Sequence, residues 1–92
     1  MKDIALNVRV TGRVQGVAYR AWTNAVAGAQ GIRGWVRNRE DGSVEALLAG
    51  PEDAVEAMVA AMSEGPGAAR VTDVWTEPAD PASAPPGFEI RH

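Results

Sequence analysis

The chain has 92 residues, 46% of them hydrophobic and none of them cysteine, which fits one compact domain over residues 1–92 and excludes disulfides, thiolate nucleophiles and cysteine-ligated metals. No apolar run reaches about 18 residues and no signal-like segment is visible, so we expect a cytosolic protein that does not enter a membrane. The net charge of -3 argues against a general nucleic-acid binder, although seven of the nine basic residues lie in residues 1–39 beside a single acid, which fits either a local anion site or a solvated charged face.

The first two predicted elements are a strand and a helix. Apolar and polar residues alternate over residues 4–11, which predicts a half-buried strand that Gly12 is expected to end. Helical spacing follows over residues 21–29, with Gly31 suited to cap the helix just beyond them. The apolar residues expected on the buried side of this helix are Trp22, Ala25, Val26 and Ala29.

A hairpin and a second helix come next. Two extended runs, residues 32–38 and 43–49, flank Asp41-Gly42, and an Asp-Gly pair between such runs is typical of a hairpin turn. Pro51 suits the first position of the second helix, which Gly65-Pro66 is expected to end. The expected buried stripe of this helix is Val55, Met58, Val59 and Met62.

The remaining residues predict a strand, a loop and a short final strand. The strand covers residues 71–76, and four of the six prolines lie between Pro78 and Pro86, which predicts a loop before a brief strand at 88–91. The element order is therefore βαββαβ plus a short terminal strand. This is the split βαβ arrangement of α+β ferredoxin-like domains, in which an antiparallel sheet carries both helices on one face.

Few residues of the chain are suited to covalent or metal chemistry. His92 is the only histidine and stands last, where chains often fray, which argues against a histidine nucleophile or relay. No Asp-x-Asp pair and no grouping of His, Asp and Glu has the spacing of metal ligands. If the chain is an enzyme, we expect it to work without a protein nucleophile or a metal.

The connection from Gly12 to Arg20 joins the first predicted strand to the first predicted helix. Helix N-termini carry unpaired N–H groups and a partial positive charge, and Gly16 permits the backbone to fold around an anion. The glycine spacing matches neither GxGxxG nor the Walker A pattern. An ordinary strand-to-helix turn therefore stays open as the simpler explanation.

Arg20 and Asn38 are the two side chains best suited to act at such a site. A cation at a helix N-terminus opposes the helix dipole by roughly 0.3–1 kcal/mol, so a bound anion would explain the position of Arg20. A salt bridge to Glu45, or a solvated guanidinium, would explain it as well. Asn38 is most simply a turn former before Asp41-Gly42, but its amide could also hold a water and donate to a phosphoryl group.

Two segments of the chain have distinctive residues and spacing: Gly12-Arg13-Val14-Gln15-Gly16-Val17-x-x-Arg20 and Gly34-Trp35-Val36-x-Asn38-x-x-Asp41-Gly42-x-Val44-Glu45. They resemble the signature segments of acylphosphatases. The likeness continues through Gly65-Pro66 and the terminal Phe88-Glu89-Ile90-Arg91, so it extends over nearly the whole chain. Ala18 and Gln30 depart from the family pattern, and a positive φ at Ala18 would cost roughly 1 kcal/mol.

The resemblance implies an activity and a role for each candidate residue. It implies hydrolysis of the carboxyl-phosphate bond of a small acyl phosphate to a carboxylate and inorganic phosphate, without a cofactor or a metal. The arginine matching Arg20 would bind the phosphate, and the asparagine matching Asn38 would orient the attacking water. A carboxylate leaves without being protonated, so no general acid is required. The loop that would wrap the phosphate comprises Gln15, Gly16, Val17, Ala18, Tyr19 and Arg20.

Other classes of protein share parts of this pattern. RNA-binding RRM domains have the same strand order, but an RNP1 motif is not visible and only 5% of the residues are aromatic, so we expect no nucleic-acid partner. A catalytically silent anion sensor, or a domain of a larger maturation or carbamoyl-transfer machine, would keep the same loop. We expect an independent, monomeric enzyme, and the sensor remains the open alternative.

Overall fold

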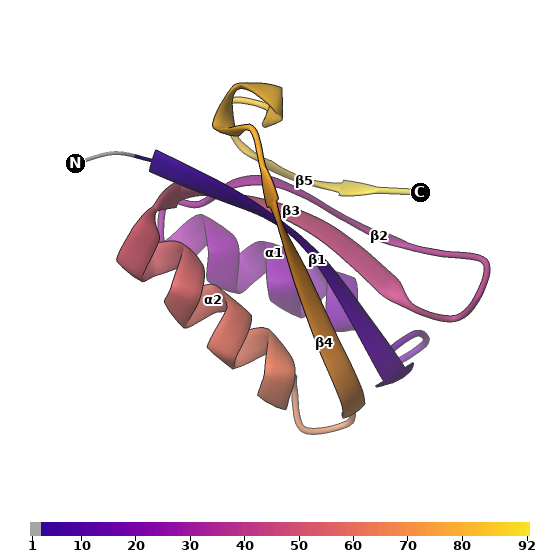
Figure 1. Cartoon of the computed structure of the whole chain (residues 1–92). Helices are drawn as coiled ribbons and strands as arrows, with labels where there is room; N and C mark the ends of the chain where they lie inside the picture. Colours follow the sequence, from indigo (N-terminus) through magenta and orange to yellow (C-terminus); the bar gives the residue numbers. More distant parts are fainter. Residues whose placement is uncertain (1–2) are drawn as a thin grey trace.

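The computed structural model describes residues 3–92. It contains a five-stranded sheet that is covered on one face by two helices (Figure 1). Met1 and Lys2, which the expected domain of residues 1–92 includes, lie outside the described residues. Within residues 3–92, no helix is long and apolar enough to cross a membrane. The elements in chain order are β1 (Asp3–Arg13), α1 (Tyr19–Ala29), β2 (Arg33–Asn38), β3 (Val44–Pro51), α2 (Glu52–Glu64), β4 (Arg70–Ala79), a 3-10 turn (Pro81–Ser83) and β5 (Phe88–Arg91).

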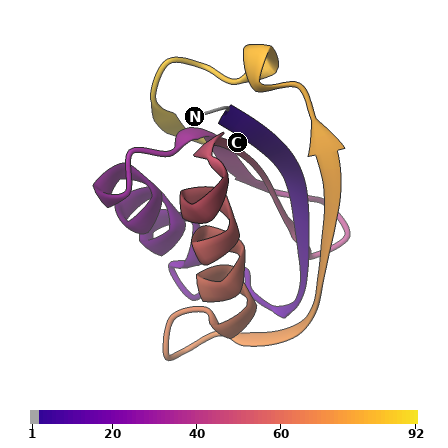
Figure 2. The same cartoon turned by 60° about the vertical axis from the view of Figure 1, so that its left-hand side comes forward.

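The order of strands across the sheet is β4-β1-β3-β2-β5. β1 lies antiparallel between β3 and β4, and β2 pairs antiparallel with β3, which confirms the ferredoxin-like arrangement and the hairpin. β5 runs parallel to β2, so the sheet is mixed. The sequence prediction of a sheet that is antiparallel throughout was wrong for this last strand. The connection after β4 crosses to the opposite edge of the sheet before β5 begins (Figure 2). The last strand then lies beside β2 and runs in the same direction.

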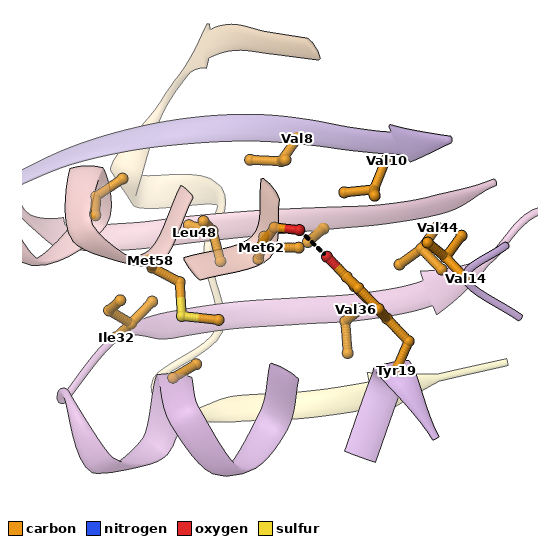
Figure 3. Packing of buried hydrophobic residues seen from close by; sticks show 13 residues of the cluster. Val8, Val10, Val14, Tyr19, Ile32, Val36, Val44, Leu48, Met58 and Met62 are labelled. Carbon is orange, nitrogen blue, oxygen red and sulfur yellow. Dashed lines mark hydrogen bonds between the residues drawn. The ribbon is translucent and has the colours of Figure 1, made fainter. Parts of the chain in front are cut away.

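The main core lies between the sheet and the two helices (Figure 3). Alternate residues of the strands point toward the helices, and α2 buries Val55, Met58 and Met62, three of the four residues expected in its stripe. The hydroxyl of Tyr19 donates a 2.7 Å hydrogen bond to the backbone oxygen of Met62, which joins α1 to α2 inside this core (Figure 3).

The buried side of α1 differs from the expected one. The helix begins at Tyr19, two residues earlier than predicted, and buries Tyr19, Thr23 and Ala27. Thr23 can be buried because its hydroxyl donates a 2.9 Å hydrogen bond to the carbonyl oxygen of Tyr19. The spacing of apolar residues does not identify this polar member of the stripe. Of the residues predicted to be buried, Trp22 and Val26 are half-buried, and Ala25 and Ala29 are exposed.

Three element boundaries also differ from the sequence prediction. β1 continues through Gly12 to Arg13, because Gly12 adopts a φ of 122° at a register shift in the pairing with β4. Pro51 is the residue before α2 and not its first residue. β4 extends beyond the predicted strand through Pro78, and this is possible because β4 is an edge strand, where a missing N–H leaves no inner partner unpaired.

The face of the sheet opposite the helices carries a second, small cluster. Trp35 packs there against Leu47 and the neighbouring alanines, and it is half-buried. The guanidinium carbons of Arg37 and Arg91 each lie 5.2 Å from the centre of a Trp35 ring. These contacts attach the end of β5 to β2.

Candidate active site

The residues between β1 and α1 form a loop that turns through two left-handed positions. Gly16 has a φ of 75° and Ala18 a φ of 62°. The loop is anchored on the core, because Val14 is buried and Val17 packs against the main cluster. Among the described residues, no backbone carbonyl accepts a hydrogen bond from the N–H groups of residues 15–18. The loop thus presents unpaired amides where α1 begins.

Ala18 is the residue at which the loop passes into α1. It occupies the N-cap position with φ 62° and ψ 25°, and its carbonyl oxygen accepts the 3.0 Å hydrogen bond of the Trp22 N–H. The first amides of a helix have no partner inside the helix, and no acidic side chain lies in the first turn of α1. The positive end of the helix dipole is therefore directed at the loop without a local carboxylate to neutralise it.

Gln15 connects the loop to the β2–β3 hairpin. Its amide nitrogen Nε2 lies 2.8 Å from the carbonyl oxygen of Arg39 and 2.9 Å from that of Ser43, and donates to both. The side chain of Gln15 is thus engaged by the hairpin, and only its backbone is available to a ligand. This link holds the loop against the strand end that carries Asn38.

Arg20 lies in the first turn of α1 without an acidic partner among the described residues. Its Nη1 donates a 3.3 Å hydrogen bond to the carbonyl oxygen of Arg91 and lies 3.2 Å from Nδ1 of His92. Glu45, the carboxylate that the sequence offered as an alternative partner, is bound elsewhere. The guanidinium of Arg20 therefore keeps most of its donors for a ligand.

The carboxylates of Glu45 and Asp41 accept hydrogen bonds from other residues of the β2–β3 hairpin. Oε1 of Glu45 accepts hydrogen bonds of 2.8 Å from Arg37 Nη2 and from Arg39 Nη1. Burial raises the pKa of Glu45, but the hydrogen bonds from the two arginines outweigh this effect and hold the pKa below its usual value. Asp41 accepts from the hydroxyl and the N–H of Ser43, which lowers its pKa and identifies it as a turn residue.

One cavity of about 390 Å³ brings the loop, α1 and β2 together. Asn38, the last residue of β2, faces it beside Arg20 and the backbone of the loop. A second cavity of about 480 Å³ lies next to it, under the hairpin, and Asn38 and His92 line both. Among the residues that line the first cavity are Gly16, Ala18, Tyr19, Arg20, Asn38 and His92.

Not all residues of the predicted loop face this cavity. Gln15 and Val17 do not line it, since one is bound to the hairpin and the other is packed on the core. Tyr19 borders it, but burial raises the pKa of its phenol well above the usual value, and the hydroxyl is bound to α2. The Tyr19 side chain is therefore structural, and only its backbone is suited to an anion.

His92 is the site residue that the sequence argument dismissed. A terminal residue is expected to fray, yet His92 lines both cavities and contacts Arg20. No local signal in the sequence could have placed it there, because its position depends on β5 running parallel to β2. Ile90 reaches the cavity by the same route.

The chemistry available at this cavity is anion binding combined with the placement of a water. A guanidinium and backbone amides at a helix N-terminus suit the oxygens of a phosphate, and a carboxamide both accepts and donates hydrogen bonds. Within residues 3–92, no three side chains of His, Cys, Asp or Glu are grouped as ligands of a metal ion.

Known proteins resemble this chain over nearly its whole length. The family model described as acylphosphatase matches residues 6–90. A curated protein of Ralstonia nicotianae named acylphosphatase 2 is 60% identical over 84 residues, which cover 91% of this chain and 88% of that protein.

Solved structures agree with the match in sequence. The crystal structure of an acylphosphatase from Bacillus subtilis aligns with a TM-score of 0.92 at 35% identity, and the alignment covers 97% of this chain and 99% of that one. A solved structure of an acylphosphatase from Coxiella burnetii aligns with a TM-score of 0.91 at 30% identity, over 97% of this chain and 93% of that one. With the sheet order, the loop and the strand-end asparagine already in place, these matches show that the chain belongs to the acylphosphatase family.

Proposed function

We propose that the chain hydrolyses the carboxyl-phosphate bond of acyl phosphates, with Arg20 and the loop amides binding the phosphoryl group and Asn38 positioning the attacking water. The observation that carries this assignment is the single cavity on which all three face. Family membership supports the activity, and the geometry of the cavity supports the role of each residue.

Binding of the phosphoryl group is assigned to Arg20 and to the amides of residues 15–20. The amides are unpaired in the loop, and the guanidinium is not neutralised by a carboxylate of residues 3–92. Phosphoryl transfer passes through a loose transition state with its charge spread over the equatorial oxygens. Donors fixed around these oxygens stabilise that charge without reorganising during the reaction.

The role assigned to Asn38 is to position the attacking water. Asn38 ends β2 beside the hairpin, and the Gln15 link holds the hairpin against the phosphate-binding loop. An amide oxygen that accepts from a water can direct its lone pair at phosphorus, in line with the departing acyl oxygen. The departing carboxylate needs no proton, so water placement and charge stabilisation suffice, without a protein nucleophile.

Hydrolysis of benzoyl phosphate by the purified protein tests this proposal. We expect turnover well above the rate in buffer. Arg20→Ala should lower kcat/KM about 100-fold or more, because it removes both binding and transition-state donors. Asn38→Ala should lower kcat by a similar factor with little change in KM, because the water is placed after the substrate has bound.

Two variants serve as matched controls. Arg33 forms a 3.5 Å salt bridge with Asp3 at the other end of the sheet, and Asn7 lies on the face opposite the helices. Arg33→Ala and Asn7→Ala should keep wild-type turnover. A wild-type rate equal to that of buffer would reject the enzyme, and phosphate binding without turnover would identify an anion sensor instead. Full activity of Asn38→Ala would remove only the water-positioning role.

The assembly proposed with this function is a monomer that forms one domain over residues 1–92. Every residue to which a role is assigned lies on this one chain, within one cavity and its loop. Light scattering of the active protein checks this state, with a mass near 9.7 kDa expected.

A further inference from the structure

His92 lies where a phosphate ligand would be expected, although no role has been assigned to it. Its Nδ1 is 3.2 Å from Arg20 Nη1, and its side chain lines the proposed phosphate cavity as well as the neighbouring one. The parallel pairing of β5 with β2 fixes the chain up to Arg91, whose guanidinium stacks on Trp35. The imidazole is thus carried to the cavity by the sheet.

The contact with Arg20 has opposite consequences for the two forms of the imidazole. A neutral imidazole can accept the hydrogen of the guanidinium at Nδ1, whereas an imidazolium donates at both nitrogens and repels the guanidinium. A dianion placed between the two groups reverses that repulsion, because each cation then donates to anionic oxygens. Imidazole is also the side chain whose charge ordinarily changes between about pH 5 and pH 8.

We propose that His92 is a further ligand of the phosphoryl group, which takes up a proton from solvent when a dianion enters the cavity and then donates a hydrogen bond to it. The inference rests on the proposed function of the cavity and adds a binding residue to it. It implies that phosphate-like dianions bind more tightly at lower pH, because proton uptake by His92 and anion binding are then coupled.

The charged groups near His92 lie on α1, on β5 and around the adjoining cavity, and Glu89 of β5 is paired with Arg91 at 3.4 Å. Arg20 faces His92 from α1, Arg91 precedes it on β5, and Arg37, Arg39, Glu40 and Asp41 line the adjoining cavity. The arginines keep their charge throughout the range considered. The lowered pKa of Asp41 keeps that carboxyl ionised there as well. Glu40 is the remaining acid of this set, and it therefore requires its own control.

Sulfate binding measured by calorimetry tests the inference without requiring turnover. Sulfate remains a dianion between about pH 5.5 and pH 8, whereas phosphate itself changes charge in this range. For the wild-type protein we expect about fivefold tighter binding at the lower pH, the size of an exposed ion pair. Proton uptake on binding should appear as a dependence of the binding heat on the ionisation heat of the buffer.

His92→Asn is the informative variant, because the asparagine amide replaces Nδ1 as an acceptor for Arg20 but cannot take up a proton. We expect its sulfate affinity at both pH values to match that of the wild-type protein at pH 8, with no proton uptake. Glu40→Gln should keep the wild-type pH dependence. A purely structural role of His92 would leave the pH dependence in place in His92→Asn.

Two results would overturn the inference: wild-type affinity that does not change with pH, or a pH dependence that persists in His92→Asn. Arg20→Ala separates this failure from failure of the proposed function. If sulfate binds Arg20→Ala as tightly as the wild-type protein, the cavity is not the anion site and both proposals are wrong. If sulfate binding depends on Arg20 but does not change in His92→Asn, only the inference on His92 is wrong.

Discussion

Ala18 stands in a backbone conformation that glycine adopts more easily, with φ 62° and ψ 25°. Ala18→Gly should raise the free energy of unfolding by about 0.5–1 kcal/mol, because relief of the left-handed strain exceeds the entropy that glycine adds to the unfolded chain. Urea denaturation followed by tryptophan fluorescence measures the change.

The reverse substitution, glycine to alanine, can be made in the same loop at Gly16. Its φ is 75°, and a Cβ added there would meet no atom within 4 Å, so the substitution to alanine tests backbone conformation alone. Gly16→Ala should lower the free energy of unfolding by about 1 kcal/mol. A stability loss in Ala18→Gly would show that the loop does not hold Ala18 in this conformation.

The carboxylate of Glu45 makes stability depend on pH. Its pKa is lowered in the folded protein from the reference value of 4.5, so its stabilisation is present above that pH and is lost as the pH falls through the folded-state pKa. Glu45→Gln should lower the free energy of unfolding by about 1–2 kcal/mol at pH 7, since it removes charge-assisted hydrogen bonds to Arg37 and Arg39.

Urea titrations at neutral pH and at about pH 3 check this assignment. The difference between the wild-type protein and Glu45→Gln should shrink below pH 4.5. Glu77→Gln, at an exposed residue of β4 without an ion pair among the described residues, should behave like the wild-type protein at both pH values. An equal difference at both pH values would assign the stabilisation to packing and not to charge.

At the scale of the elements, the close approach of β2 to β3 depends on Gly34. This glycine has a φ of 144°, and a Cβ there would lie 1.7 Å from the carbonyl oxygen of Leu47. Gly34→Ala should lower the free energy of unfolding by at least about 3 kcal/mol, because a backbone atom of the neighbouring strand must move. Loss of the cooperative thermal transition would be the extreme form of this result.

A glycine-to-alanine substitution within α1 should have the opposite effect on the free energy of unfolding. Gly28 lies in the helix, and a Cβ there would meet nothing within 4 Å. Gly28→Ala should raise the free energy of unfolding by about 0.5–1 kcal/mol, because alanine loses less backbone entropy in a helix. If both alanine substitutions destabilise equally, the effect of Gly34 does not arise from the contact with Leu47.

The elements that sequence could predict are those governed by local rules. The Asp41-Gly42 turn, the cap at Gly31 and the stripe of α2 depend on spacing and on backbone preference, and the structure confirms them. The buried side of α1 could not be predicted in this way, because Tyr19 is placed by its bond to α2 and Thr23 by its bond to Tyr19.

Contacts distant in sequence account for the rest of the differences. The parallel direction of β5 and the length of β4 follow from the sheet order, which no local pattern encodes. In the candidate site, sequence could select Arg20, Asn38 and the loop by resemblance, whereas the contacts of Gln15 and His92 arise only when separate segments meet.

At the scale of the whole molecule, a ligand of the cavity should stabilise the fold. Inorganic phosphate at ten times its dissociation constant stabilises the folded state by about 1.4 kcal/mol. For a chain of 92 residues this corresponds to a rise in Tm of roughly 5–10 °C. Differential scanning fluorimetry should detect the shift in the wild-type protein and in Arg33→Ala.

Arg20→Ala should lose this stabilisation by phosphate, because Arg20 is the proposed guanidinium partner of the anion. The comparison depends on binding alone, so it remains informative for a variant without turnover. An equal rise in Tm for Arg20→Ala and the wild-type protein would place phosphate binding elsewhere on the molecule.

The two ends of the described chain lie at opposite ends of the sheet (Figure 1). Asp3 pairs with Pro51, far from the hairpin, whereas Arg91 lies beside Arg37 and is followed by His92 at the cavity. A purification tag or fusion partner attached before Asp3 would thus begin away from the cavity. One attached after His92 would emerge at its mouth, compete with substrates for access and displace the imidazole, so recombinant versions of this protein should carry their tags at the N-terminal end.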